Sequence, residues 1–348
     1  MLTVRKCMAR TFTETELKSR VPPSVSPIPG ANTAFGEYTG GCLVALLNLL
    51  LICLAEFVAR WMDAGIGLSV HALTLLALLL IAAFDPSHKV RRLSLSLTLI
   101  PVIRIVGSSM PPGALPALER YVVVAAALSV AAIVVIRQLA LRPEEIGLGF
   151  GEKPWWLAGY SLLFVLVAAI LILRAPTSFL PAITVELVSL SVGFVEALIF
   201  YGIALRASRD LLGDRTSVIY LSLILAVLQL PVFSWPGGLI TFMTSLLLGY
   251  LVMRKSTIYI AALAYGLTNT VLLLLLPPMN IRSPIDDSWG PVLFAVLLLA
   301  LLAIKELAGT SAADERWPAF RRSLNMAIVP MTILFMIFAA LRIVDALH

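Results

Sequence analysis

Long apolar runs alternate with short polar connections along most of this chain. From Gly41 onward the runs cover residues 41–59, 67–84, 94–109, 121–137, 156–173, 183–205, 217–233, 238–253, 257–276, 289–304 and 324–341. A helix needs about 20 apolar residues to cross the hydrocarbon layer, so the pattern predicts an all-α, polytopic transmembrane helical bundle of about 11 spans (10–11). Several runs are shorter than this length, and we expect those helices to be tilted or re-entrant.

Composition supports a membrane protein. Hydrophobic residues make up 60% of the chain and charged residues 13%, with a mean hydropathy of +0.97. Soluble domains carry about 25% charged residues, which excludes an ordinary soluble fold. We expect an integral membrane protein, and its expected location is the bacterial cytoplasmic membrane.

Basic residues indicate an orientation. Residues 1–40 are polar, interrupted by prolines, and basic, and most of the 26 Lys and Arg residues fall in connections on the same side as this segment. By the positive-inside rule, residues 1–40 form a basic cytoplasmic tail, with the N-terminus inside and the C-terminus outside. The net charge of +6 is thus a topology signal, and without a basic face of interleaved aromatics we expect no nucleic-acid partner. The expected partners are membrane lipids and another membrane protein.

One acid, Glu196, lies well inside the apolar run 183–205. An ionised carboxylate in hydrocarbon costs at least a few kcal/mol, so such a residue is a functional candidate with a partner to be identified. Taking Leu205 as the cytoplasmic end, Glu196 lies about 13 Å deep at the helical rise.

Three further polar residues reach a similar depth on the following helices. Gln229 and Asn269 lie about 18 Å from the cytoplasmic ends of their helices, and Tyr265 about 12 Å. Tyr265 and Asn269 are four residues apart and share a helix face. The sequence therefore predicts one central polar layer of Glu196, Gln229, Tyr265 and Asn269, turned inward so that its members satisfy one another.

These positions resemble the motifs of the CPBP family of intramembrane proteases, which includes the type II CAAX prenyl proteases and the bacteriocin-processing ABI proteins. The family carries Glu-Glu-x-x-x-Arg, Phe-x-x-x-His and His-x-x-x-Asn/Asp on successive membrane helices. The corresponding segments here are Glu196-Ala197-Leu-Ile-Phe200-Tyr201-Gly202, Leu225-Ala-Val-Leu-Gln229 and Tyr265-Gly-Leu-Thr-Asn269. The lead-in Glu145-Ile-Gly147-Leu148 and the run Leu248-Gly249-Tyr250 before Arg254 are also similar to the family pattern.

The resemblance implies four regions in the chain. They are the tail 1–40, N-terminal transmembrane helices 41–140, a CPBP-like core 141–280 and C-terminal transmembrane helices 281–348.

The departures from the family pattern fall on the catalytic positions. The second glutamate is Ala197, the arginine is Tyr201, and the two histidines are Gln229 and Tyr265. In the family, glutamate and histidines are thought to activate water by a metal-assisted or a glutamate-based route, and both routes need a tunable base and an electrophile. Gln229 cannot exchange a proton near pH 7, and Tyr265 is a poor base there.

We expect a site without metal or cofactor. The only histidines, His71, His88 and His348, lie outside the matched region, and no nucleotide, calcium or HExxH motif occurs. One glutamate with Gln and Asn amides does not supply the three or four ligands of a zinc site. His71 is expected to be a hydrogen-bonded helix residue, Arg104 to snorkel to the outer surface, and Glu186 to be interfacial.

The alternatives for Glu196 stay open. A protonated Glu196 that donates to Gln229 or Asn269 would be interhelical glue, whereas a retained pocket would bind a polar group of a lipid or peptide. The favoured function is a catalytically inactive homologue that serves as a scaffold or binding subunit of a membrane complex. The runner-up is a divergent active endopeptidase with Glu196 as base and Gln229 or Tyr265 as oxyanion donor. A lipid or small-solute carrier is the third.

Overall fold

The computed structural model describes residues 31–108, 117–149, 179–274, 289–310 and 316–347. Every regular element among them is a helix, and the described residues contain no strand. The described residues from Gly40 onward belong to one compact unit. The first thirty residues of the predicted tail and the apolar run 156–173 lie outside the described residues.

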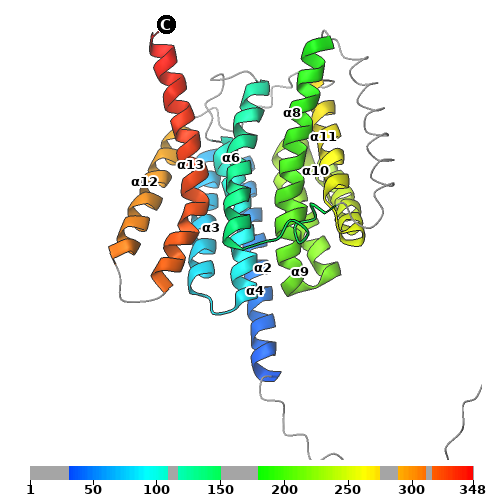
Figure 1. Ribbon diagram of the computed structural model, residues 1–348, viewed down its shortest axis with the longest axis vertical. Coiled ribbons are helices and arrows are strands. Elements are labelled where there is room, and N and C mark those ends of the chain that lie inside the picture. The colour runs from blue at the N-terminus through cyan, green and yellow to red at the C-terminus, as the bar shows by residue number, and fades with distance from the viewer. Residues whose placement is uncertain (1–30, 109–116, 150–178, 275–288, 311–315, 348) are drawn as a thin grey trace, which may run out of the picture. The chain divides into compact units, whose positions relative to one another are not determined.

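Most helices run side by side in the unit Gly40–His348, as Figure 1 shows. The first group is α2 (Ala31–Trp61), α3 (Ala64–Phe84), α4 (His88–Leu97), α5 (Leu99–Ser108) and α6 (Ala117–Gln138). The second is α8 (Phe179–Ala197), the π-helix η1 (Leu198–Ala204), α9 (Leu205–Leu212), α10 (Asp214–Lys255) and α11 (Tyr259–Leu274). The last two are α12 (Trp289–Thr310) and α13 (Arg316–Leu347).

Helix ends follow ordinary capping chemistry. Asp63 caps α3, its side chain accepting a hydrogen bond from the Ile66 N–H at 2.8 Å. Between α9 and α10, Gly213 takes a positive φ of 79°, which glycine adopts without a Cβ penalty. The helix break at Gly213 therefore falls in the polar stretch between the predicted apolar runs 183–205 and 217–233.

The predicted span at 94–109 is two short helices. α4 ends at Leu97 and α5 begins at Leu99, and Thr98 between them donates its hydroxyl to the Leu95 carbonyl at 2.6 Å. Neither helix alone approaches the length of a membrane crossing. Residues 94–109 are therefore not one continuous spanning helix.

Helix α10 folds back on itself. The assignment is continuous over Asp214–Lys255, yet a Cβ built on Gly249 would lie 2.9 Å from Cγ1 of Val218. In a straight helix these residues would be about 46 Å apart. Pro231 and Pro236 lie between them in sequence, and proline lacks the N–H that a helix interior needs. The two runs predicted at 217–233 and 238–253 are therefore the two antiparallel arms of α10.

The outer faces of the helices are apolar. On α2, Leu43, Leu50, Leu54 and Phe57 are each at least 50% exposed. Large apolar faces of this kind are rare on soluble monomers and are normal where lipid covers the helix. By length and composition, six of the described helical segments could cross a membrane. The chain is an integral membrane protein, while the count of about 11 spans and the cytoplasmic N-terminus stay predictions.

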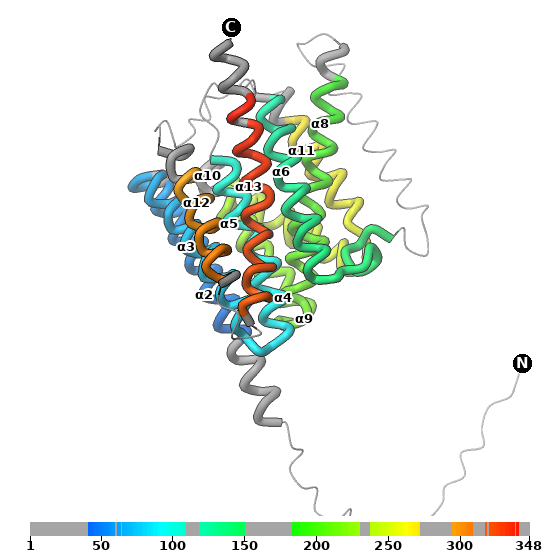
Figure 2. Tube along the Cα trace, turned by 60° about the vertical axis from the view of Figure 1, so that its left-hand side comes forward, coloured from blue at the N-terminus to red at the C-terminus, as the bar shows by residue number. Residues whose placement is uncertain are grey.

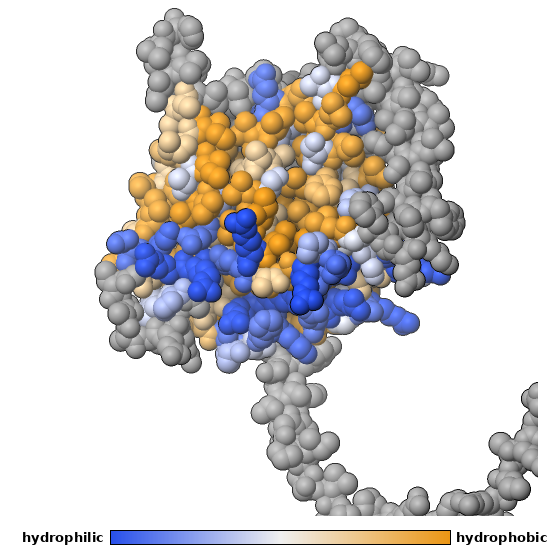
Figure 3. Space-filling model, in the orientation of Figure 1, coloured by the Kyte–Doolittle hydropathy of each residue, from blue (hydrophilic) through white to orange (hydrophobic). Residues whose placement is uncertain are grey.

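Polar residues gather at the end of the bundle where α4 and α9 lie. Figures 1 and 2 both place these two helices together at that end, and Arg92 of α4 pairs with Asp210 of α9 at 2.8 Å. Figure 3 shows a hydrophilic band there, with a largely hydrophobic surface beyond it. This segregation is the pattern expected where a lipid-covered bundle meets an aqueous phase.

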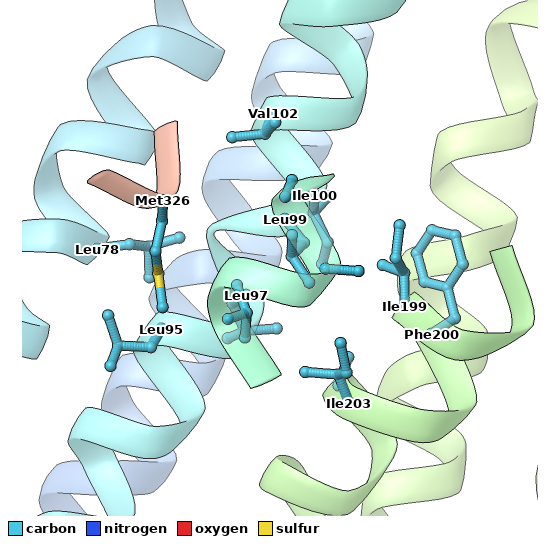
Figure 4. Close-up of a cluster of buried hydrophobic side chains, with 14 of the residues drawn as sticks. Leu78, Leu95, Leu97, Leu99, Ile100, Val102, Ile199, Phe200, Ile203 and Met326 are labelled. Carbon is cyan, nitrogen blue, oxygen red and sulfur yellow. The ribbon is translucent and has the colours of Figure 1, made fainter. Parts of the chain in front are cut away.

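Buried side chains from distant segments join the N-terminal helices to the motif-bearing ones. In Figure 4, Leu97 of α4 and Leu99 and Ile100 of α5 approach Ile199 and Ile203 of η1. All five side chains are at most 1% exposed. The η1 segment that follows Glu196 is therefore held from one side by α4 and α5.

Candidate functional site

Two glycines bring α8 and α11 into backbone contact. A Cβ on Gly193 would lie 2.2 Å from the Gly266 nitrogen, and one on Gly266 would lie 3.0 Å from the Leu190 Cα. Small residues allow such close approach between membrane helices. This contact sets the spacing of the predicted site, because Glu196 lies on α8 and Asn269 on α11.

The predicted partnership between Glu196 and Asn269 is present. The Asn269 side-chain amide donates to Oε2 of Glu196 at 3.3 Å. Asn269 is buried, at 8% exposed. Of the two amides considered as partners for Glu196, the structure brings Asn269 to it, with the amide nitrogen as the donor.

A π-helix follows Glu196 directly. In η1 the backbone N–H of Leu205 bonds to the carbonyl of Phe200, five residues earlier. π-Helical turns are rare, occur frequently at functional sites, and stack residues that are five apart. Tyr201 lies within this π-helix, and its ring faces that of Tyr265 on α11, with ring centroids 6.1 Å apart.

Three hydroxyl groups meet beside the Glu196–Asn269 pair. Tyr201 of η1, Tyr265 of α11 and Ser245 of the second α10 arm lie near one another, and the two tyrosine rings have centroids 6.1 Å apart. The Tyr201 side chain is fully buried, and its hydroxyl makes no hydrogen bond of ordinary geometry with the described residues. The polar layer predicted from the sequence includes Tyr265 but neither Tyr201 nor Ser245.

Gln229 stands apart from the other predicted members. It lies half-buried on the first arm of α10, and among the described contacts no hydrogen bond joins it to Glu196, Tyr265 or Asn269. The predicted layer of four residues is therefore, in the described part of the chain, a cluster of three with Tyr201 and Ser245 added.

The lead-in segment, which includes Ile146, Gly147 and Leu148, contacts both η1 and the segment where α11 begins. Gly147 has a positive φ of 76°, and its carbonyl accepts the N–H of Ile258 at 3.0 Å, just before α11 begins. The Leu148 carbonyl accepts the Tyr259 hydroxyl at 3.0 Å. A Cβ on Gly202 of η1 would lie 3.0 Å from the Ile146 carbonyl. One short turn thus anchors both η1 and the start of α11.

A second acid joins α8 to α11. Thr270 donates its hydroxyl to Oε2 of Glu186 at 2.7 Å, and Glu186 is buried, at 9% exposed. Glu186 therefore packs into the contact between α8 and α11, and its expected depth at the membrane interface stays a prediction. In the sequence, the residue that could have indicated this contact is Thr270, a polar residue that directly follows Asn269 of the predicted layer.

The donor set does not fit a zinc ion. Within the described residues, no group of three His, Cys, Asp or Glu side chains is placed to hold a metal. The cluster offers one carboxylate, one amide and three hydroxyls, whereas catalytic zinc sites use three nitrogen, sulfur or carboxylate ligands. We therefore assign no metal-dependent chemistry to this cluster.

Comparison with known proteins identifies the region that carries this site. Residues 154–271 match the family model described as "Type II CAAX prenyl endopeptidase Rce1-like". The searches of curated proteins and of solved structures gave no match. The matched region contains Glu196, Tyr201, Ser245, Tyr265 and Asn269 in one cluster. The match at residues 154–271 therefore supports the assignment of this region to the CPBP/CAAX protease family.

Proposed function

We propose that this protein is a non-catalytic member of its family, which serves as a binding or scaffold subunit of a membrane complex. The observation that carries the proposal is the chemistry of the cluster. Glu196 faces a neutral amide, and tyrosines occupy the positions at which the family pattern has arginine and its second histidine. Hydrolysis of a peptide bond needs a base, a water and an electrophile, and this cluster supplies no cation and no histidine.

The same groups are suited to binding. The Tyr201 hydroxyl is a buried donor without a hydrogen bond of ordinary geometry, and the Glu196 carboxyl is an acceptor already oriented by Asn269. A buried polar group without a partner is costly, and a ligand or partner group that meets it recovers part of that cost. Polar groups of this kind in hydrocarbon recognise amide or hydroxyl groups of a neighbouring transmembrane segment or lipid.

Native co-purification tests the proposal. The wild type, E196A and the matched variant E186A are each extracted in mild detergent, and the co-purifying proteins are identified and counted by mass spectrometry. We expect a stoichiometric membrane-protein partner with the wild type. E196A is expected to retain that partner or to lose it only partly, because Glu196 is one of several contacts. E186A reports the effect of removing an acid from the same helix interface without touching the cluster.

Other outcomes would support the other functions. A divergent active endopeptidase would give no stable partner with the wild type, and a membrane substrate would be trapped by E196A alone. A lipid or small-solute carrier would release a stoichiometric small molecule from the wild type in place of a protein. The proposed location for all three is the bacterial cytoplasmic membrane.

A further inference from the structure

A cluster of charged side chains lies outside the Rce1-like region, where three helices meet. Oε1 of Glu56 on α2 accepts from Nε of Arg104 on α5 at 2.5 Å, and it lies 3.2 Å from Nε2 of His71 on α3. The side chains of Glu56 and His71 are 6% and 3% exposed, and that of Arg104 is 25% exposed. Arg104 therefore turns inward, and its expected snorkelling to the outer surface is wrong. His71 is hydrogen-bonded within the bundle, as expected.

The charges in this cluster are balanced. Oε1 of Glu56 lies within hydrogen-bonding distance of both the Arg104 guanidinium and the His71 ring, and the carboxylate and the guanidinium carry opposite charges. The other ring nitrogen of His71, Nδ1, is buried without a hydrogen-bond partner among the described residues. Intramembrane ionisable residues are rare, and they are costly unless they are paired. A cluster of three such residues on three helices is therefore a candidate for a specific structural or functional role.

A third contact links this cluster to the Rce1-like region. The Arg104 guanidinium, through Nη2, donates to the backbone carbonyl of Leu228 on the first arm of α10. Leu228 directly precedes Gln229, which occupies the position of the family's first histidine. Pro231 supplies no N–H to the carbonyl of Val227, four residues earlier, so the helix is weakened at this same turn. Arg104 therefore adds an external donor at the carbonyl that directly follows the one Pro231 cannot bond.

We propose that Arg104 is a positioning residue, anchored by Glu56 and His71, that fixes the end of the first α10 arm and thereby the place of Gln229. Arginine suits this task because its planar guanidinium presents several donors in a fixed fork, and here one edge meets a carboxylate while another meets a carbonyl. The N-terminal helices thus set the geometry of a domain to which they do not belong in sequence. The inference goes beyond the proposed function, since it concerns how the first α10 arm, which carries Gln229 outside the binding cluster, is held in place.

A charge swap separates positioning from simple ion pairing. In E56R/R104E the two charges attract as before, but a carboxylate at position 104 cannot donate to the Leu228 carbonyl. R104K keeps a cation with donors at position 104, and R104M keeps an apolar side chain of similar length. Each variant is made in a full-length chain whose native cysteines are replaced by serine. Spin labels are placed at Leu73→Cys on α3 and Leu223→Cys on α10, both of which are exposed, at 66% and 38%.

Pulsed electron paramagnetic resonance in lipid bilayers then reports the distance between α3 and the first α10 arm. We expect R104K to retain the wild-type distance distribution and R104M to shift or broaden it. The swap is expected to recover wild-type thermal stability while its distance distribution stays shifted. A wild-type distribution in R104M, or in the swap, would overturn the proposal. If the swap does not fold, the comparison of R104K with R104M decides alone.

The readout is independent of any partner. Loss of the proposed function in the co-purification experiment would leave the distance measurement unaffected, because the latter uses only this chain in lipid. Conversely, an unchanged distance in R104M would remove the positioning role and leave the binding proposal intact.

Discussion

At the scale of single residues, two acids of this bundle, Glu196 and Glu56, have different kinds of partner. Glu196 accepts from the neutral amide of Asn269, whereas Glu56 accepts from the cation Arg104 and from His71. A neutral hydrogen bond between membrane helices contributes about 0.6 kcal/mol, whereas breaking a buried ion pair by removing one partner costs about 3–5 kcal/mol. The site predicted from the motifs is therefore the more tolerant of the two to substitution.

Replacement of Glu196 by Gln should leave the stability nearly unchanged, because a glutamine oxygen still accepts from Asn269. Asn269→Leu removes the donor and should lower the free energy of unfolding by about 0.6–1.7 kcal/mol. Unfolding by sodium dodecyl sulfate in mixed micelles measures both values. A loss from E196Q larger than that from N269L would mean that Glu196 has a second, stronger partner.

At the scale of elements, the contact between α8 and α11 holds the cluster together. Gly193 and Gly266 allow their backbones to touch, and two pairs cross this interface, Glu196–Asn269 and Glu186–Thr270. The Tyr201 ring of the π-helix η1 faces that of Tyr265 on α11. The geometry of the cluster thus depends on backbone contacts more than on any one side chain.

Gly193→Ala should therefore disrupt the interface, because the new Cβ would lie 2.2 Å from the Gly266 nitrogen and the helices must separate. We expect a loss of about 1–3 kcal/mol in the free energy of unfolding, as is typical of overpacking. Gly107→Ala is the matched control, since nothing lies within 4 Å of its Cβ. That control should be neutral or stabilising by up to about 1 kcal/mol from helix propensity. Equal losses in the free energy of unfolding of the two variants would show that the close approach of α8 and α11 does not determine the stability.

The fold-back of α10 predicts a cross-link. Val218→Cys and Gly249→Cys should form a disulfide readily in a chain without its native cysteines, because the two positions touch across the arms. Val218→Cys with Leu239→Cys is the control, since Leu239 lies about 15 Å along the second arm from Gly249. Mobility on denaturing gels after mild oxidation and protease cleavage between the arms measures both pairs. Cross-linking of the control pair alone would contradict the antiparallel arrangement.

Much of this architecture could be predicted from periodicity, and the failures have identifiable physical causes. Apolar runs bounded by polar residues gave the bounds of α2, α3, α6 and α12 to within a few residues at most ends. The run 94–109 was misread because hydropathy does not register the break at Thr98. Two prolines suggested that α10 has two arms, and the contact of Val218 with Gly249 supports this reading.

The candidate site was only partly predictable, because depth along a helix says little about the direction of a side chain. Asn269 was paired correctly with Glu196, since both lie deep on neighbouring helices. Tyr201 was missed because its neighbours in the cluster, Tyr265 and Ser245, lie on other helices that are distant in sequence. Glu56 was missed, although it, His71 and Arg104 are isolated polar residues in three separate apolar runs, and such residues tend to find one another.

At the scale of the whole molecule, the Rce1-like domain is embedded among helices that the family model does not cover. α4 and α5 pack on η1, α6 lies beside α8, and Arg104 reaches the first arm of α10. Within the cluster, Tyr201 and Asn269 are buried, whereas Glu196 and Tyr265 are half-buried.

The most direct test of the central claim compares membrane proteomes. Cells that carry the wild type, E196A or a deletion of the whole gene are analysed by quantitative mass spectrometry of the termini of membrane proteins. If the protein is a non-catalytic subunit, wild type and E196A give the same set of termini, and any change in the deletion concerns the abundance of its partner. An uncleaved membrane protein that accumulates in both E196A and the deletion, and is cleaved in the wild type, would contradict the account and make Glu196 catalytic.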